Sequence, residues 1–417
     1  MSLYLAHLIA PACPNLAPMN KDLSLLQRYP FEKLAELKRD LHPPAALEHI
    51  ALSIGEPRHP APQVVLDSLI SHLHLLSTYP STRGSPPLRE AIAAWLSKRF
   101  DIPAGQLDPE RNVLPVSGTR EALFAIAQCL IDRSAANPLL LMPNPFYQIY
   151  EGAALLSGAT PRYLDCLSET GFLPDLDAVT DREWADCQMI YICNPGNPTG
   201  AVMSRAYLQQ LIELAHRHDF VIASDECYSE IYFDEQQPPA GLLGVAAEMG
   251  LEDFSHCLAF NSLSKRSSLP GLRSGFVAGD AELLEQFLLY RTYHGCALPP
   301  ATQTASTVAW QDEAHVVENR RLYREKFEQV LALLSDTLAP QKPQAGFFLW
   351  AQTPLSDEEF TRRLYAEQNV TVLPGRYLAR ETQAGNPGEN RVRMALVAPL
   401  DECLEAAQRI NSLLAVL

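Results

Sequence analysis

Short apolar runs alternate with longer amphipathic stretches through the middle of the chain. The runs lie at residues 112–116, 138–142, 188–193, 220–224, 257–260 and 275–279. Because they lack an apolar–polar alternation, they are typical of strands covered on both faces. Stretches between them, such as residues 204–218, repeat apolar positions at helical spacing. This order predicts an α/β fold with a mostly parallel sheet covered by helices and joined by right-handed crossovers.

The pattern changes after about residue 300. A long charged helical stretch, residues 312–336, leads to short apolar runs at 346–351, 370–375 and 392–397, and a last helix is expected from about residue 400. This arrangement predicts a smaller α+β domain. We expect four parts: a disordered extension over residues 1–18, a segment over 19–55 that joins the small domain, a large ligand-binding domain over 56–295, and the C-terminal small domain over 296–417.

The composition excludes several classes of protein. With 417 residues, 47% hydrophobic and 20% charged, the chain is typical of a globular protein with ample core. A formal net charge of −16 argues against nucleic acid or an anionic membrane as partner, and it favours a cytoplasmic protein. Nine cysteines without a CxxC pair indicate a reducing compartment, and no metal site is expected. No apolar run approaches the roughly 20 residues of a membrane span.

Polar residues that follow the apolar runs are the candidates for chemistry, since ligands bind beyond the carboxyl ends of parallel strands. Gly118, Thr119 and Arg120 open a helix whose free amides suit a phosphate, although small polar residues there are more often plain caps. Tyr147 would stack on a planar ligand or simply pack in its loop. Asn197 lies in the rigid turn "NPGNPTG", which fixes the direction of its amide.

Lys265 stands just beyond the run at 257–260, at the mouth of a predicted buried strand. Most lysines are solvated surface residues, but burial there would lower the pKa and make the amine a nucleophile. Asp225 and Tyr228 follow the preceding strand, and a buried carboxylate needs a cation nearby. Ser262 and Arg273 flank the lysine closely enough to share a phosphate.

Arg393 opens a late strand and suits a bidentate grip on a carboxylate. Taken together, these residues predict one ligand that combines a phosphate, a flat ring with a cationic nitrogen and an anionic oxygen, and an aldehyde for the lysine. That ligand is pyridoxal phosphate.

The ordered motifs "GTREA", "NPGNPTG", "SDECY", "SLSK", "GLRSG" and "VRMAL" resemble those of the class I/II aminotransferases of fold type I, over about residues 20–415. The resemblance implies that Lys265 forms a Schiff base with the cofactor and that Asp225 faces its pyridine nitrogen. It also implies that Tyr228 and Asn197 contact the 3′-oxygen and that Tyr147 stacks on the ring. The phosphate would be held by Gly118, Thr119, Arg120, Ser262 and Arg273.

The same resemblance assigns substrate and partner contacts. Arg393 would bind the substrate α-carboxylate, which Gly55 would approach through its backbone. Tyr79 matches the tyrosine that reaches the phosphate of a neighbouring subunit, which implies a homodimer with shared active sites. Arg120 departs from the family pattern, because a small or neutral residue is common there; if it points into the site, it adds positive charge.

Longer stretches, such as "YPFEKLAEL" and "SLSKRSSLPGLRSGFVAGD", resemble the proteobacterial succinyldiaminopimelate transaminases. This implies amino transfer between N-succinyl-LL-2,6-diaminopimelate and 2-oxoglutarate in lysine biosynthesis. Both substrates carry more carboxylate than Arg393 can bind, so a second cation is needed. Arg291 is the first candidate, with Arg266 and Arg83 as rivals, and each could equally be a surface arginine.

Three alternatives remain open. An aminotransferase for aspartate, aromatic or other amino acids would use the same cofactor residues and differ only in its distal pocket. A pyridoxal-phosphate-dependent β-lyase would also share them. A non-enzymatic regulator is disfavoured, because regulators of this fold usually carry a fused DNA-binding domain and this chain is acidic.

Overall fold

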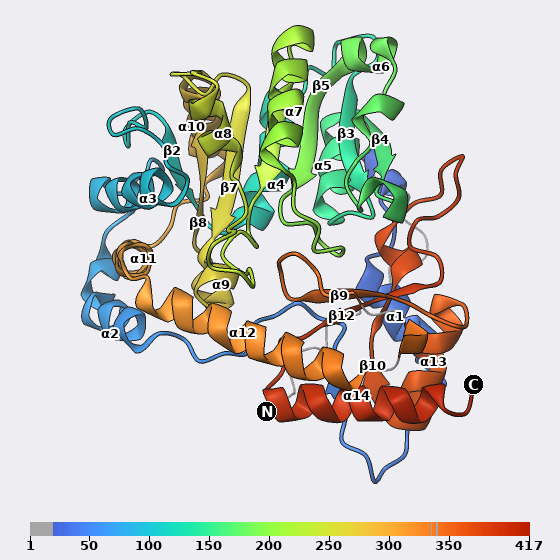
Figure 1. The fold of residues 1–417 in the computed structure, drawn as a ribbon. Coiled ribbons are helices and arrows are strands. Elements are labelled where there is room, and N and C mark those ends of the chain that lie inside the picture. Colours follow the sequence, from blue (N-terminus) through green and yellow to red (C-terminus); the bar gives the residue numbers. More distant parts are fainter. Residues whose placement is uncertain (1–19, 335, 339–340) are drawn as a thin grey trace.

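The computed structural model describes residues 20–334, 336–338 and 341–417. The predicted extension over residues 1–18 lies outside the described residues. Figure 1 shows a large sheet flanked by helices above a smaller part that contains the C-terminus. Among the described helices, none has both the length and the apolar character needed to cross a membrane.

A seven-stranded sheet forms the centre of the larger part. In sheet order its strands are β2 (Val113–Val116), β8 (Gly275–Gly279), β7 (Cys257–Ser262), β6 (Val221–Asp225), β5 (Cys187–Cys193), β3 (Leu139–Asn144) and β4 (Thr160–Asp165). Only β8 runs antiparallel to its neighbours, so the predicted α/β class with a mostly parallel sheet is confirmed. The edge strand β4 was not predicted, because its partly exposed sequence "TPRYLD" contains no apolar run.

Helices cover both faces of this sheet. Ile190 and Ile192 of β5 pack into the core under one set of helices: α3 (Pro86–Arg99), α7 (Arg205–His218), α8 (Leu242–Glu248) and α11 (Pro300–Gln311). Met189 and Tyr191 of the same strand face the core under α4 (Thr119–Leu130), α5 (Ile149–Ser157) and α10 (Ala281–His294). Successive side chains of a strand point to opposite faces, so two buried faces explain the unbroken apolar runs.

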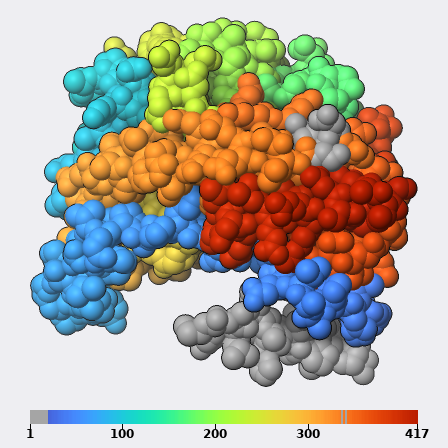
Figure 2. Space-filling model, turned by 60° about the horizontal axis from the view of Figure 1, so that its bottom comes forward, coloured from blue at the N-terminus to red at the C-terminus, as the bar shows by residue number. Residues whose placement is uncertain are grey.

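The smaller part contains a three-stranded antiparallel sheet in the order β11 (Leu373–Pro374), β12 (Arg391–Ala395) and β9 (Phe348–Gln352). A separate parallel pair joins β1 (Ile50–Ala51) to β10 (Val370–Thr371), so the N-terminal segment contacts the C-terminal third of the chain. The helices here are α1 (Pro30–Leu37), α12 (Ala314–Leu333), α13 (Asp357–Gln368) and α14 (Leu400–Leu414). Figure 2 shows α12 and α14 side by side across the bottom face. The exact domain boundaries stay a prediction.

Shorter elements complete the fold. The remaining α-helices are α2 (Gln63–Ser71), α6 (Asp181–Asp186) and α9 (Leu263–Arg266). Single 3-10 turns occur at Lys21–Leu25, Leu73–Ser77, Ser168–Thr170, Leu176–Ala178, Pro270–Leu272, Asp336–Leu338 and Gly375–Leu378. Among these elements, α9 matters most for function, because it carries Lys265.

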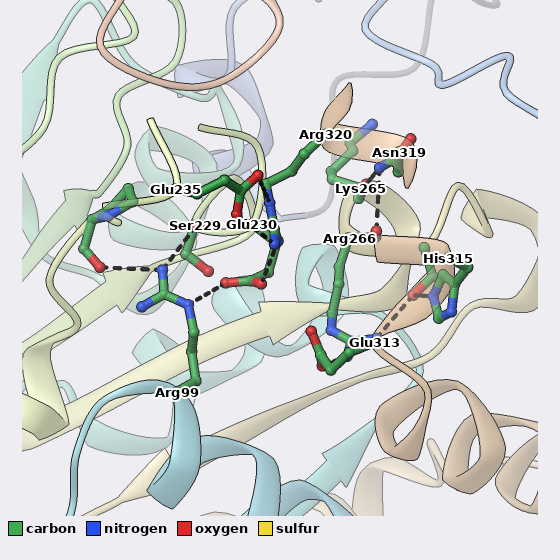
Figure 3. A network of polar contacts seen from close by, with 12 residues as sticks. Arg99, Ser229, Glu230, Glu235, Lys265, Arg266, Glu313, His315, Asn319 and Arg320 are labelled. Atoms are coloured by element: carbon green, nitrogen blue, oxygen red, sulfur yellow. Dashed lines mark hydrogen bonds and ion pairs between the residues drawn. The ribbon is translucent and has the colours of Figure 1, made fainter. Parts of the chain in front are cut away.

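A buried ion-pair network ties α12 to the larger part (Figure 3). Glu230 is 2% exposed and bridges two arginines: Oε1 lies 2.6 Å from Arg99 Nε on α3, and Oε2 lies 3.3 Å from Arg320 Nη1 on α12. Arg320 also pairs with Glu235 at 3.0 Å. Each buried charge therefore has an opposite charge as partner, as burial in a low-dielectric interior requires.

We expect Glu230→Gln to lower the free energy of unfolding by about 3–5 kcal/mol, because it leaves two largely buried guanidiniums without their shared carboxylate. Urea-induced unfolding measures the change. Glu367→Gln is the matched control, because it breaks a solvent-exposed pair with Arg363 on α13 and is expected to leave stability nearly unchanged. Equal losses in the two variants would show that the network does not join α12 to the larger part in this way.

Candidate active site

A cavity of about 540 Å³ opens beyond the carboxyl ends of β5, β6 and β7, where the two parts of the chain meet. Eleven of the residues that sequence analysis assigned to the site line it: Gly55, Thr119, Arg120, Tyr147, Asn197, Asp225, Tyr228, Ser262, Lys265, Arg273 and Arg393. Strand geometry explains this convergence, since Asp225 ends β6 and Ser262 ends β7. The site combines one amine, one buried carboxylate and three guanidiniums with Glu56 at its edge.

Lys265 lies on the single-turn helix α9, which Ser262 caps by accepting a hydrogen bond from the Ser264 N–H at 3.1 Å. The Lys265 Nζ donates to the Gly55 carbonyl of the N-terminal segment. Asn319 on α12 donates to the backbone carbonyls of Lys265 and Arg266 at 3.1 and 3.2 Å, which fixes the end of α9 (Figure 3). Burial lowers the pKa of the Lys265 amine to about 8.

Asp225 is 4% exposed, and two donors hold its carboxylate. The Tyr150 hydroxyl donates to Oδ2 at 2.7 Å, and the Cys227 N–H donates to Oδ1 at 3.3 Å. Burial nevertheless raises the pKa of Asp225, so the carboxylate favours a cation in the cavity. Sequence reasoning missed Tyr150. Tyr150 lies on α5 and Tyr147 just before that helix, with the two rings 5.7 Å apart, and no motif in the sequence marked the contact of Tyr150 with Asp225.

One end of the cavity suits a phosphate. Gly118 has φ +84°, a backbone conformation that favours glycine, and the Arg273 guanidinium lies directly against it. The N-terminus of α4 begins at Thr119, beside the paired hydroxyls of Ser262 and Ser264, whose oxygens are 2.9 Å apart. Free helix amides, hydroxyls and a guanidinium together match the chemistry of a phosphate.

Arg393 lies on β12 and is buried, with its guanidinium 4.4 Å from the centre of the Phe348 ring. Nη1 donates to Asn197 Oδ1 at 3.0 Å, and Nη2 donates to the Ser53 carbonyl at 2.9 Å. Its Nε is buried without a partner among the described residues. Burial lowers the pKa of Arg393 to about 10, so an anion in the cavity would relieve the cost of the buried charge.

None of the three arginines predicted to bind a second carboxylate lines this cavity of the described chain. Arg291 is buried on α10, where it donates to both Glu121 carboxylate oxygens at 2.8 Å. Arg266 is fully buried and does not line the cavity, and its side chain extends toward Glu313 on the side opposite to Lys265 (Figure 3). Arg83 donates to the Glu110 carbonyl and pairs with Glu285 at 3.0 Å.

Two other predicted site residues, Gly118 and Tyr79, do not line the cavity. Gly118 borders the phosphate end through its contact with Arg273. Tyr79 is 99% exposed and lines a second hollow with Arg83 and Arg89, outside the site of its own chain. A wholly exposed tyrosine of this kind suits a contact with another molecule.

Apolar residues that sequence reasoning did not identify close the cavity. The N-terminal segment contributes Tyr29 and Phe31, and the small sheet contributes Phe348 and Leu373. No local motif marks these positions, because they reach the site only through the packing of the N-terminal segment against the C-terminal third of the chain.

Comparisons with known proteins agree with this geometry. A family model described as aminotransferase class I and II matches residues 48–410. The LL-diaminopimelate aminotransferase of Maridesulfovibrio salexigens is 30% identical over 402 residues, which cover 94% of this chain and 98% of the relative.

Two solved structures extend the comparison. The crystal structure of an aminotransferase from Neisseria meningitidis is 46% identical with a TM-score of 0.91, and the match covers 95% of this chain and 100% of that chain. A structure described as "probable N-succinyldiaminopimelate aminotransferase" from Thermus thermophilus is 29% identical with a TM-score of 0.81, and the match covers 92% of this chain and 99% of that chain.

The lowered pKa of Lys265 predicts how its reactivity depends on pH. The neutral amine attacks a carbonyl, so in cofactor-free protein the rate of reaction with pyridoxal phosphate should rise with pH to a midpoint near 8, not near the ordinary value of 10.5. Stopped-flow absorbance measures the rate, and Lys265→Ala supplies the background from other lysines. A midpoint near 10.5 would mean that the amine is not desolvated.

Proposed function

The chain belongs to the family of class I and II aminotransferases, and from this membership we propose that it moves an amino group between N-succinyl-LL-2,6-diaminopimelate and 2-oxoglutarate in lysine and diaminopimelate biosynthesis. It is a pyridoxal-phosphate-dependent aminotransferase. The observation that carries the proposed amino transfer, whatever the donor, is the meeting of the Lys265 amine, the Asp225 carboxylate and the Arg393 guanidinium in one cavity.

The donor is proposed from the relatives and from the size of the cavity. The Thermus chain is described as a probable N-succinyldiaminopimelate aminotransferase, and the Maridesulfovibrio relative is an LL-diaminopimelate aminotransferase. A cavity of about 540 Å³ is large enough for a long, branched donor beside a bound cofactor. Free LL-diaminopimelate is the second candidate donor, because the curated relatives at about 30% identity carry that name.

The residues present fit pyridoxal phosphate. Its phosphate would be held by the N-terminus of α4 with Ser262 and Arg273. Its ring nitrogen would be held by Asp225, and the positive charge of that nitrogen would lower the pKa of Asp225, which burial raises. Tyr228 and Asn197 would contact the ring oxygen, and Tyr147 would stack on the ring. When bound, the cofactor supplies an electron-accepting ring that stabilises negative charge at the substrate Cα.

Lys265 would carry the proton. With a pKa of about 8, a fraction of its Nζ is neutral near physiological pH and would accept a proton from the substrate Cα, and the protonated Nζ would then serve as the acid. Arg393 would orient the substrate by binding its α-carboxylate, and Gly55 would approach that group through its backbone. Phe348 and the N-terminal segment would limit the access of water.

We propose the cytoplasm as the location of this activity. The eight described cysteines are all free thiols, and most are buried. This supports the expected reducing compartment.

A screen of amino donors against 2-oxoglutarate tests the proposed substrate. We expect N-succinyl-LL-2,6-diaminopimelate to give the highest kcat/KM among a set that also contains LL-diaminopimelate, aspartate, tyrosine and N-acetylornithine. Preference for LL-diaminopimelate would favour the second candidate. Preference for aspartate or tyrosine would contradict the proposed substrate and leave the family assignment intact. Release of ammonia and pyruvate would indicate a β-lyase.

Replacement of Lys265 tests the proposed proton carrier. Lys265→Ala is expected to lower kcat by at least about 10²–10⁴-fold, the usual contribution of a positioned acid–base group. The single-turnover rate of amino transfer from glutamate measures the loss, and circular dichroism checks that the fold is retained. A variant that transfers amino groups at the wild-type rate would refute the role.

We also propose a homodimer with shared sites, in which Tyr79 reaches the cofactor phosphate of the partner subunit. The support is its full exposure within a segment that also exposes Ile70, Leu73 and Leu76 at 65%, 48% and 59%. Such an apolar surface is typical of an interface.

Mixing two impaired variants tests the shared sites. Tyr79→Ala and Lys265→Ala chains, dissociated and reassembled together, should regain about a quarter of wild-type activity, because each mixed dimer contains one complete site. Sedimentation velocity confirms the oligomeric state, and each variant reassembled alone is the control. If the mixture stays as inactive as the separate variants, Tyr79 does not act across an interface.

A further inference from the structure

We propose that the Arg120 side chain binds the second carboxylate of dicarboxylic substrates and so determines specificity for them. The inference deepens the proposed function, because it depends on the aminotransferase site. It does not depend on which diaminopimelate is the donor, since 2-oxoglutarate and glutamate carry a second carboxylate as well.

A count of the cations in the described lining leads to Arg120. The lining contains four, namely Lys265, Arg273, Arg393 and Arg120. Lys265 is the proposed proton carrier, and Arg273 lies against Gly118 at the phosphate end. Arg393 is the proposed α-carboxylate group. Arg120 is therefore the cation in the described lining that no other part of the site uses.

The contacts of Arg120 leave it free to bind an anion. Its Nε donates to the hydroxyl of Tyr147, another residue of the cavity lining, at 2.7 Å, which fixes the direction of the side chain. Its two Nη groups make no ion pair or hydrogen bond with any residue that the structure describes. Arg120 is the second residue of α4, and a cation near a helix N-terminus is unfavourable for the helix itself. The fold therefore gains little from an arginine here.

Arg120 and Arg393 line the same cavity, and Tyr29 lines it with them. Arg393 is buried, whereas Arg120 is exposed to solvent. A dicarboxylate held by Arg393 at one end would present its other carboxylate to the free Nη groups of Arg120, whereas a monocarboxylate would leave them in water.

The backbone and the side chain of Arg120 can serve different groups. Its N–H belongs to the first turn of α4, which faces the phosphate end, while its guanidinium extends toward Tyr147. The family-based assignment of this residue to the phosphate is therefore compatible with its N–H, and the side chain is left for the substrate.

Two substitutions separate charge from position. Arg120→Gln removes the charge and retains a donor for the Tyr147 hydroxyl, and Arg120→Lys retains the charge without the planar fork. Arg182→Gln on α6 is the matched control, because that side chain is 86% exposed and does not belong to the described cavity lining. Tyr147→Phe removes the hydroxyl that orients Arg120 and retains the ring.

The test compares dicarboxylic with monocarboxylic ligands. Single-turnover amino transfer is measured with glutamate and with alanine, and the binding of glutarate and butyrate to the holoenzyme is measured by calorimetry. In Arg120→Gln we expect kcat/KM for glutamate and the affinity for glutarate to fall about tenfold or more, with alanine and butyrate changed less than about twofold. Arg120→Lys should lie between Arg120→Gln and the wild type, and Arg182→Gln should match the wild type.

Other outcomes would overturn the inference. If Arg120→Gln lost activity equally with glutamate and with alanine, Arg120 would instead act on the cofactor or position Tyr147. If Tyr147→Phe showed the same equal losses, the role of Arg120 would be to position Tyr147. Unchanged binding of glutarate would remove Arg120 from the substrate site. Failure of the proposed diaminopimelate donor in the screen would leave this test intact, because glutamate and glutarate do not depend on it.

Discussion

The cost of burying charge beyond the ends of the strands is the constraint on which this site depends. Asp225 and Arg393 are buried and Lys265 is partly buried, and each charge is costly there without a partner. The chain supplies partial compensation only. Tyr150 donates to Asp225, and carbonyls accept from Lys265 and Arg393, but the Nε of Arg393 stays unpaired among the described residues. A ligand with complementary charges would supply the partners that these buried groups lack within the protein.

Three distant parts of the chain provide this partial compensation. The N-terminal segment contributes the carbonyls of Ser53 and Gly55, and it is held near the site by the pairing of β1 with β10. Helix α12 contributes Asn319, which binds the backbone of Lys265. The sheet contributes Asp225 at the end of β6. The site therefore depends on the packing of three segments that lie far apart in the sequence.

The buried arginines show why similar residues take different roles. Arg266 and Arg291 pair with Glu313 and Glu121, so their charges are satisfied inside the protein and serve stability. Arg393 has no carboxylate partner among the described residues and faces a cavity. A buried guanidinium is thus available for a ligand only where no carboxylate of the protein pairs with it. The sequence alone does not show which arginines have such a carboxylate.

The sequence by itself determined most of the large sheet and predicted which residues would meet at its edge. The apolar runs predicted six of the seven strands of the large sheet, because a strand buried on two faces requires unbroken apolar sequence. The seventh strand, β4, was not predicted because it is partly exposed and its sequence contains no apolar run. Lys265, Asp225 and Asn197 could be brought together because each follows a strand whose end lies at one edge of the sheet. Tertiary structure decided what spacing cannot encode: that Tyr150 donates to Asp225, that Arg291 pairs with Glu121, and that the Nη groups of Arg120 have no partner among the described residues. Those outcomes depend on which side chains meet across the fold, and local sequence carries no record of contacts between residues far apart in the chain.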